Sequence, residues 1–197
     1  MRDGADGKAH ALAREGGGDS ALKDGPEARA RLVCLRLLTH APQTRAQLAD
    51  ALSRRGIPAE IADNVLGRFT DVGLIDDAAF ARAWVESRHY SRGLAGRALT
   101  AELKRRGVAD DEIREAVAEL GPDAEVATAR ELVARKLAAT KGQPTQARVR
   151  RLTGMLARKG YPPGLAFRVI REAMATEGAD VDLGEESPFD EAYIDTE

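Results

Sequence analysis

The chain has 197 residues, of which 43% are apolar, 4% aromatic and 31% charged. A core built mainly from Leu, Ala and Val favours packed helices over sheets, so we expect an all-α protein. The single cysteine, Cys34, excludes an internal disulfide, and three scattered histidines give no zinc ligand set. With neither a signal peptide nor a long apolar run, we expect a cytoplasmic protein with no metal, cofactor or membrane contact.

The net charge of −2 conceals a strong segregation of charge along the chain. Residues 29–175 carry 26 Lys and Arg against 17 Asp and Glu, whereas residues 176–197 carry nine acidic and no basic residues. A basic body attracts anionic partners such as nucleic acid or an acidic protein surface. Solvated arginine-rich helices without a partner are the alternative explanation.

The N-terminal stretch, residues 1–27, contains three consecutive glycines, scattered charges and few large apolar side chains. Such a composition buries too little surface to offset the entropy of ordering the chain. We therefore expect a disordered arm here.

After this arm, one short pattern occurs three times: LSRRGIPAEI at 52–61, ELKRRGVADDE at 102–112 and LARKGYPPGL at 156–165. We call these copies the first, second and third basic motifs. In each, a leucine is paired with another leucine four residues earlier and is followed by two basic residues and a glycine; the pairs are Leu48/Leu52, Leu99/Leu103 and Leu152/Leu156. The glycines lie 51 and 53 residues apart. Self-similarity at a fixed period predicts a tandem array of supersecondary units.

Each copy also marks the end of one helix and the start of the next. Glycine adopts the left-handed conformation that ends a helix, and cations in the last turn favour the negative end of the helix dipole. Pro58, Pro163 and the pair Asp110–Asp111 suit the first turn of the following helix. Thr44 and Gln47 form a capping-box pattern at the second helix of the first unit.

A further helix is expected upstream of each copy, at about 27–40, 77–90 and 123–140. Each unit then contains three helices. The predicted units are residues 28–72, 73–121 and 122–176.

Residues 177–197 are expected to form an acidic, disordered tail with Phe189, Tyr193 and Ile194 as apolar contacts. The tail either keeps the protein soluble or folds back on the basic body and competes with its partner.

The middle unit resembles a known family. From Asp76 the chain reads DDAAFARAWVESRHYSRGLAGRALTAELKRRGV, which is similar to the RecX family of cytoplasmic bacterial regulators of the RecA recombinase. The resemblance covers about residues 30–175 and is tightest over 73–120. It implies three tandem three-helix repeats in an elongated, curved array that lodges in the groove of the RecA filament on DNA. It also implies modulation, usually inhibition, of recombinase and coprotease activity, and some affinity for DNA.

Several side chains of the middle unit have both a structural and a functional interpretation. Phe80 and Trp84 share a helical face and fit core packing. Arg88 continues that face and either pairs with a carboxylate such as Glu102 or contacts a partner. His89 and Tyr90 are either an ordinary helix end or stacking groups for bases.

The loop SRGLAGR at 91–97 places two glycines beside Arg92 and Arg97, just before a helix. It is either a flexible connector or a clamp for phosphate or acidic side chains. It lacks the pattern of a Walker loop, so a nucleotide pocket is disfavoured.

On equivalent positions of stacked units, the basic helix ends would place cations at regular intervals along one side of the molecule, which suits a partner with repeating charge. The predicted contacts to the RecA filament or to DNA phosphate are Arg54, Arg55, Arg88, Arg92, Arg97, Lys104, Arg105, Arg106, Arg148, Arg150, Arg151, Arg158 and Lys159. The residues with a predicted structural role are Phe80, Trp84, Leu99, Leu103, Gly56, Gly107 and Gly160.

We therefore predict a monomeric, non-enzymatic regulator of RecA in homologous recombination, DNA repair and the SOS response, which also binds single- or double-stranded DNA with weak sequence preference. The alternative is a transcription regulator with helix-turn-helix-like units, although the third helices are acidic or mixed in charge. An enzyme is disfavoured, because Cys34 lies in an apolar helix and no catalytic cluster is evident.

Overall fold

The computed structural model describes residues 25–178, and this range contains nine helices and no strand. The prediction of an all-α fold is confirmed. The expected N-terminal arm and acidic tail lie almost entirely outside the described residues. No helix within residues 25–178 has the length and apolar character needed to cross a bilayer.

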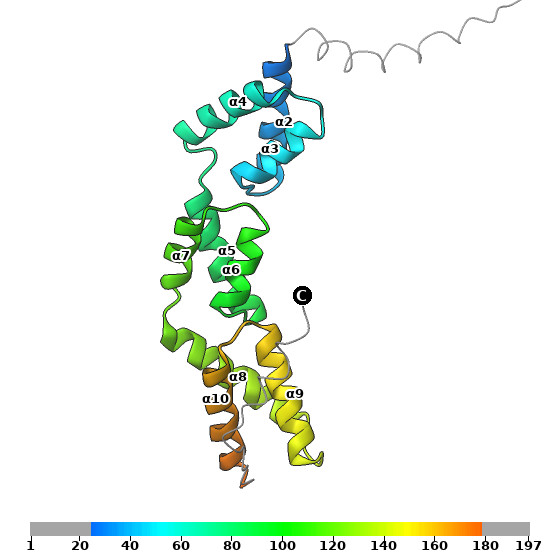
Figure 1. Cartoon of the computed structure of the whole chain (residues 1–197), viewed down its shortest axis with the longest axis vertical. Helices are drawn as coiled ribbons and strands as arrows, with labels where there is room; N and C mark the ends of the chain where they lie inside the picture. The colour runs from blue at the N-terminus through cyan, green and yellow to red at the C-terminus, as the bar shows by residue number, and fades with distance from the viewer. Residues whose placement is uncertain (1–24, 179–197) are drawn as a thin grey trace, which may run out of the picture. The chain divides into compact units, whose positions relative to one another are not determined.

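The described residues divide into two compact units, with the boundary between Asp77 and Ala78. The first, unit 1, contains α2 (Pro26–His40), α3 (Arg45–Ser53) and α4 (Ala59–Asp71), each of which packs against the other two (Figure 1). Leu48, Leu52 and Leu66 are fully buried at its centre, together with the sulfur-bearing side chain of Cys34. The leucine pair of the first basic motif is therefore core.

The second compact unit, unit 2, contains two sets of three helices. The first set is α5 (Asp77–Arg92, whose first residue is counted in unit 1), α6 (Gly96–Lys104) and α7 (Asp110–Ala118). The second set is α8 (Pro122–Ala138), α9 (Thr145–Arg158) and α10 (Pro163–Thr176). The three sets of three helices agree with the predicted repeats, and we call them repeats 1, 2 and 3.

The helix ends follow the chemistry expected from the sequence. Gly56, Gly107 and Gly160 have φ angles of 69°, 76° and 85°, the left-handed conformation that glycine adopts without strain. The Thr44 hydroxyl accepts a hydrogen bond from the Gln47 backbone amide, and the Gln47 side chain accepts one from the Thr44 amide, which confirms the capping box. Pro58 occupies the N-cap of α4, one position earlier than a first-turn residue.

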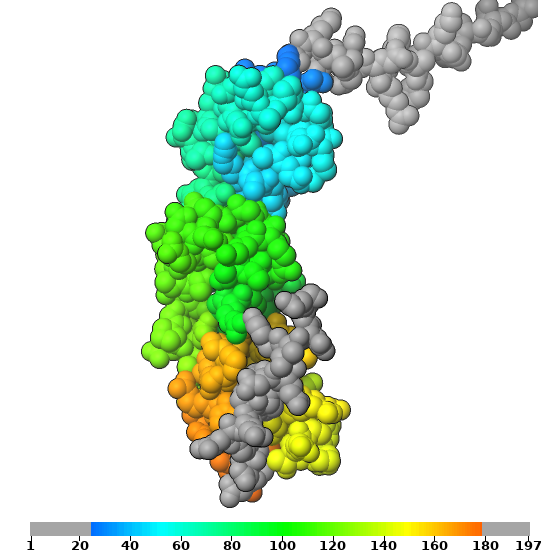
Figure 2. Space-filling model, viewed as in Figure 1, coloured from blue at the N-terminus to red at the C-terminus, as the bar shows by residue number. Residues whose placement is uncertain are grey.

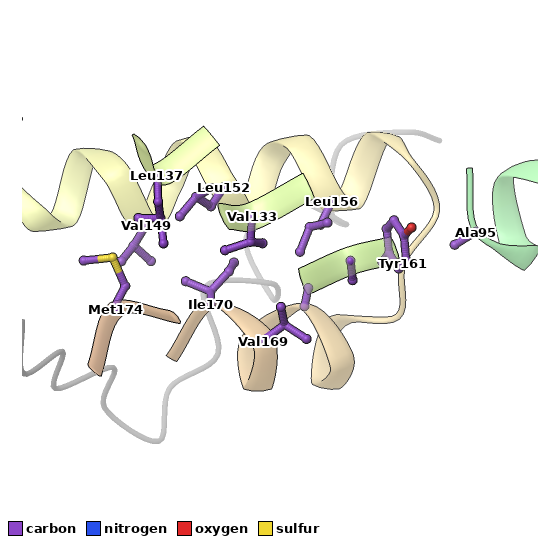
Figure 3. Packing of buried hydrophobic residues seen from close by; sticks show 12 residues of the cluster. Ala95, Val133, Leu137, Val149, Leu152, Leu156, Tyr161, Val169, Ile170 and Met174 are labelled. Atoms are coloured by element: carbon purple, nitrogen blue, oxygen red, sulfur yellow. The ribbon is translucent and has the colours of Figure 1, made fainter. Parts of the chain in front are cut away.

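Each repeat has a hydrophobic core of its own, and the core of repeat 3 extends into repeat 2. Figure 3 shows Leu152, Leu156 and Ile170 packed between the helices of repeat 3, with Ala95 at the end of the same cluster. Ala95 belongs to the loop before α6 in repeat 2 and is fully buried. Figure 2 shows side chains of repeat 2 (green) meeting those of repeat 3 (orange), so these two repeats form one packed unit.

Candidate partner-binding surface

Trp84 of α5 lies on the face between α5 and α6 and contacts both aromatic and charged side chains there. Its ring stacks on Phe80, with centroids 5.7 Å apart and an interplanar angle of 14°. The guanidinium carbons of Arg88 and Arg106 lie over the Trp84 ring, 4.1 Å and 3.7 Å from its centroid. Trp84 Nε1 also donates a hydrogen bond of 2.8 Å to Glu102 Oε2. Phe80 and Trp84 are only partly buried, so they cap the core of repeat 2 at its edge.

The cations on this face are held in place by the ring and by Glu102. Arg88 Nε lies 3.8 Å from Glu102 Oε2, which is the ion pair that the sequence suggested. Burial lowers the pKa of Arg106, and the nearby positive charge of Arg88 lowers it further. Stacking on an indole ring compensates part of this cost, because the face of the ring attracts a cation. Both arginines are therefore partly engaged within repeat 2.

The third basic motif docks on the loop 91–97 of repeat 2. Ala95 N donates a hydrogen bond of 2.8 Å to the Lys159 carbonyl, and Lys159 Nζ donates one to the Arg92 carbonyl. The Tyr161 hydroxyl donates to the Gly93 carbonyl at 3.1 Å. Burial raises the pKa of Tyr161, and the charge of Glu125 adds to this, so the phenol stays a neutral donor. The motif thus joins two repeats as well as ending α9.

The loop 91–97 was predicted to be either a connector or a clamp for phosphate or acidic side chains. Two of its backbone amides already donate hydrogen bonds within the protein. Gly96 N donates to Glu125 Oε1 at 2.6 Å, and Ala95 N donates to the Lys159 carbonyl. The loop therefore holds α8 and the end of α9 through these two amides. The side chains of Arg92 and Arg97 remain exposed beside it.

A hollow of about 570 Å³ lies where α6 meets the end of α9, and we call it the first basic hollow. Arg97 and Arg105 come from α6 and Arg158 from the end of α9, so the hollow combines cations from two successive repeats. Its one carboxylate, Glu102, already accepts from Trp84. The full lining is Leu94, Arg97, Ala98, Ala101, Glu102, Arg105, Ala157, Arg158, Gly160, Tyr161 and Pro163.

A second hollow, of about 810 Å³, lies between the end of α5 and α8, and we call it the second basic hollow. Arg92, Arg135 and Lys159 supply its positive charge, and Glu131 is its one carboxylate. Arg135 was missed by sequence reasoning because it lies outside the repeated motif. The available signal was the run of basic residues, Arg135 and Lys136, in the last turn of α8. The full lining is His89, Tyr90, Ser91, Arg92, Gly93, Leu94, Thr128, Glu131, Leu132, Arg135 and Lys159.

His89 and Tyr90, at the end of α5, have different roles. The His89 ring nitrogens lie 2.8 Å from the Leu94 carbonyl and 2.8 Å from Thr128 Oγ1, so the ring bridges α5 and α8. Tyr90 is 93% exposed. The alternative of an ordinary structural position therefore fits His89, whereas a stacking role for Tyr90 stays a prediction.

The remaining predicted contact residues fall in several environments. Arg54 and Arg55 are exposed at the end of α3 in unit 1, where Arg54 pairs with Asp50 and Arg55 donates to the Ala51 carbonyl. Lys104 pairs with Asp110 at 2.9 Å.

On α9, Arg150 and Arg151 are exposed, whereas Arg148 is 8% exposed. The Arg148 guanidinium pairs with Glu177 and donates to Thr140 Oγ1 and the Leu137 carbonyl. Arg148 therefore has a structural environment.

Metal-ligating and thiol side chains are not clustered in the part of the chain that the structure describes. Residues 25–178 contain no cluster of three or more His, Cys, Asp or Glu able to hold a metal ion. Cys34 is fully buried, and burial raises the pKa of its thiol. A neutral buried thiol is a poor nucleophile.

Comparisons with known proteins agree with this architecture. Models of RecX match the chain in three places: the first three-helix domain at residues 30–69, the second at 76–117 and the third at 123–170. The chain is 61% identical over 166 residues to "Regulatory protein RecX" of Thermobifida fusca, which covers 84% of this chain and 90% of that protein. It is 58% identical over 162 residues to the protein of the same name from Streptomyces lividans, covering 82% and 86%.

Among solved structures, the crystal structure of RecX from Lactobacillus salivarius aligns with a TM-score of 0.71. The alignment covers 76% of this chain and 97% of that chain at 16% identity. At this identity the likeness concerns the fold.

Proposed function

The chain belongs to the RecX family of regulatory proteins, and on that premise we propose that it binds the RecA filament on DNA and lowers its activity. The activities concerned are strand exchange, DNA-dependent ATP hydrolysis and coprotease stimulation, in homologous recombination, DNA repair and the SOS response. The protein acts in the cytoplasm as a monomer, by binding and without catalysis.

The observation that carries this proposal is the first basic hollow. Arg97, Arg105 and Arg158 line it from two repeats, and the small side chains of Ala98, Ala101 and Ala157 belong to the same lining. A concave, positively charged surface lined in part by small side chains suits an acidic segment of a protein partner. Because a filament presents the same surface many times, several repeats of one chain can contact it together, and the combined affinity exceeds that of one contact.

The direct test is charge reversal at two residues of the first basic hollow, Arg105→Glu with Arg158→Glu. Both side chains are exposed, and they come from different repeats. Arg106 is avoided, because its guanidinium stacks on Trp84 and its replacement would disturb the fold. We expect wild-type protein to suppress DNA-dependent ATP hydrolysis by its cognate RecA. The double variant should need at least about tenfold more protein for the same suppression, since truncating or reversing charges at an interface costs on the order of 1–3 kcal/mol.

The matched control is Arg114→Glu with Arg168→Glu, which makes the same change in charge at exposed positions of α7 and α10 outside both hollows. The control should suppress hydrolysis as wild type does. Full suppression by the Arg105/Arg158 variant, with unchanged helix content by circular dichroism, would count against the hollow as the contact. Absence of suppression by wild-type protein would count against the function.

The competing function, sequence-specific transcription regulation, requires a helix that enters the major groove. The third helix of repeat 2, α7, carries Asp110, Asp111 and Glu112 in its first turn. These carboxylates repel phosphate and oppose groove entry. A strong preference for one genomic sequence over random DNA in a binding assay would revive this alternative.

A further inference from the structure

Tyr90 is the one aromatic side chain of residues 25–178 that is mostly exposed. It lies in the last turn of α5, directly after His89, whose ring is held between the Leu94 carbonyl and Thr128. The backbone that carries Tyr90 is therefore fixed while its ring faces solvent. Core packing does not account for a ring in this position, whereas a flat apolar ligand would.

The cations beside Tyr90 come from three separate segments of unit 2. Arg92 ends α5, Arg135 lies in the last turn of α8, and Lys159 follows α9. These three cations outnumber the single carboxylate, Glu131, so the second basic hollow has an excess of positive charge. Burial lowers the pKa of Lys159, and the charge of Arg135 lowers it further, so the two cations repel each other. A bound anion would relieve this repulsion.

The walls of this hollow are held together before any ligand arrives. Lys159 Nζ donates to the Arg92 carbonyl, which ties the end of α9 to the end of α5. Gly93, with a φ of 61°, lies against α8 so closely that an added Cβ would come 3.0 Å from Leu132. A preformed site loses less conformational entropy on binding than one that must be ordered.

The exposed Tyr90 ring beside several cations favours one class of anionic ligand over others. An acidic peptide would use the cations and leave the ring without a role. A duplex keeps its bases stacked on one another and so leaves the ring without a base to stack on. A single strand uses both, because its unstacked bases lie on aromatic side chains while its phosphates meet Lys and Arg. The volume of about 810 Å³ falls within the range of small-molecule sites, about 300–1,000 Å³, and so admits a nucleotide.

We propose that the second basic hollow binds single-stranded nucleic acid, with a base stacked on Tyr90 and backbone phosphates facing Arg92, Arg135 and Lys159. The polar side chains Ser91 and Thr128 are already bonded within the protein, to the Ser87 carbonyl and to His89. They are therefore not available to form hydrogen bonds with the edges of bases, and we expect binding with little sequence preference. The role of this site in regulating the filament rests on the proposed function. In that role the second basic hollow binds a DNA strand and the first basic hollow binds protein.

The test measures binding of the full chain to a fluorescently labelled oligo-dT strand, without RecA, by fluorescence anisotropy. Tyr90→Ala should weaken binding by about fivefold or more, the effect of losing one stacked base. Tyr90→Phe keeps the ring and should bind as wild type does. Because Tyr90 is almost fully exposed, neither change should disturb folding, which circular dichroism checks.

The role of the cations toward phosphate is tested with Arg135→Glu in the same assay. It should weaken binding and reduce the slope of log affinity against log salt by about 0.7 for each phosphate that the protein no longer neutralises. Arg114→Glu makes the same charge change on α7, outside the hollow, and should have little effect. Equal weakening by both variants would overturn the site, because it would indicate general electrostatic attraction.

Two further outcomes decide between this inference and its alternatives. Wild-type affinity of Tyr90→Ala for the single strand would overturn the stacking role, and so would an equal loss of affinity for a duplex of the same length. A normal suppression of RecA ATP hydrolysis by wild-type protein alongside either outcome would leave the proposed function standing. Conversely, Tyr90-dependent strand binding by a protein that does not affect RecA would support this site and contradict the function.

Discussion

Gly160 lies close against the backbone of α6, at the junction of repeats 2 and 3 in unit 2. A Cβ added to it would lie 2.4 Å from the backbone nitrogen of Ala98 and 2.7 Å from the Ala98 Cβ. Its φ of 85° also disfavours any side chain. Glycine is thus required here for two independent reasons, helix termination and close packing on α6.

Replacing Gly160 with Ala should lower the free energy of unfolding of unit 2 by more than the left-handed backbone alone would explain. Gly142→Ala is the control, because Gly142 has a φ of 84° and no atom within 4 Å of its added Cβ. We expect the control to cost about 1–2 kcal/mol and Gly160→Ala about 1–3 kcal/mol more, from the forced separation of the repeats. Urea unfolding followed by Trp84 fluorescence measures both.

Trp84 suits this measurement because it is the one Trp of the chain and lies in repeat 2. Equal losses of stability in the two glycine variants would contradict a tight junction at Gly160.

At the scale of helices, the local signals in the sequence were sufficient to locate most ends. The first helices of the three repeats were predicted at 27–40, 77–90 and 123–140 and are observed at Pro26–His40, Asp77–Arg92 and Pro122–Ala138. Glycine and proline act within a few residues of their own position, so their effects can be read from a single sequence. The capping box at Thr44 is predictable for the same reason.

The site was less predictable, because it depends on packing between elements. The repeated motif places Arg106 and Lys159 in similar sequence contexts, yet one stacks on Trp84 and the other bonds to the Arg92 carbonyl. Arg148 looked like a surface cation and is buried against Glu177. Arg135 joins the second basic hollow only because α8 lies beside the end of α5. None of these neighbours is close in sequence.

The capping box offers a test at the element scale. Thr44→Val keeps the volume of the side chain but removes the hydroxyl that accepts from the Gln47 amide at the start of α3. We expect a loss of about 1–2 kcal/mol in the free energy of unfolding of unit 1. Thr39→Val is the control, since the Thr39 hydroxyl is exposed and donates only to the Leu35 carbonyl within α2.

The control should change stability by no more than about 0.5 kcal/mol. Circular dichroism during urea unfolding is the appropriate measurement, because Trp84 lies in unit 2 and does not report on α3. A loss for Thr44→Val no larger than that for Thr39→Val would contradict the capping role.

At the scale of the molecule, repetition has different consequences in the two units. Repeats 2 and 3 share the buried residue Ala95 and the contacts of the third basic motif, so they form one compact unit with two basic hollows. Repeat 1 has a separate core around Leu48 and Leu66. The motif ends a helix in every repeat, and in unit 2 its third copy also joins repeats 2 and 3 through Lys159, Gly160 and Tyr161. Three-helix repeats of this size bury limited surface alone, which favours such pairing.

Recognition of RecA assembled on DNA by this chain can be measured directly by co-sedimentation. RecA assembled on a long single strand pellets on ultracentrifugation, whereas unassembled RecA stays in solution. We expect the purified chain to pellet with the filament in saturable amounts and the Arg105→Glu/Arg158→Glu variant to pellet at least about tenfold more weakly. A wild-type chain that stays in the supernatant while the filament pellets would contradict the proposed function.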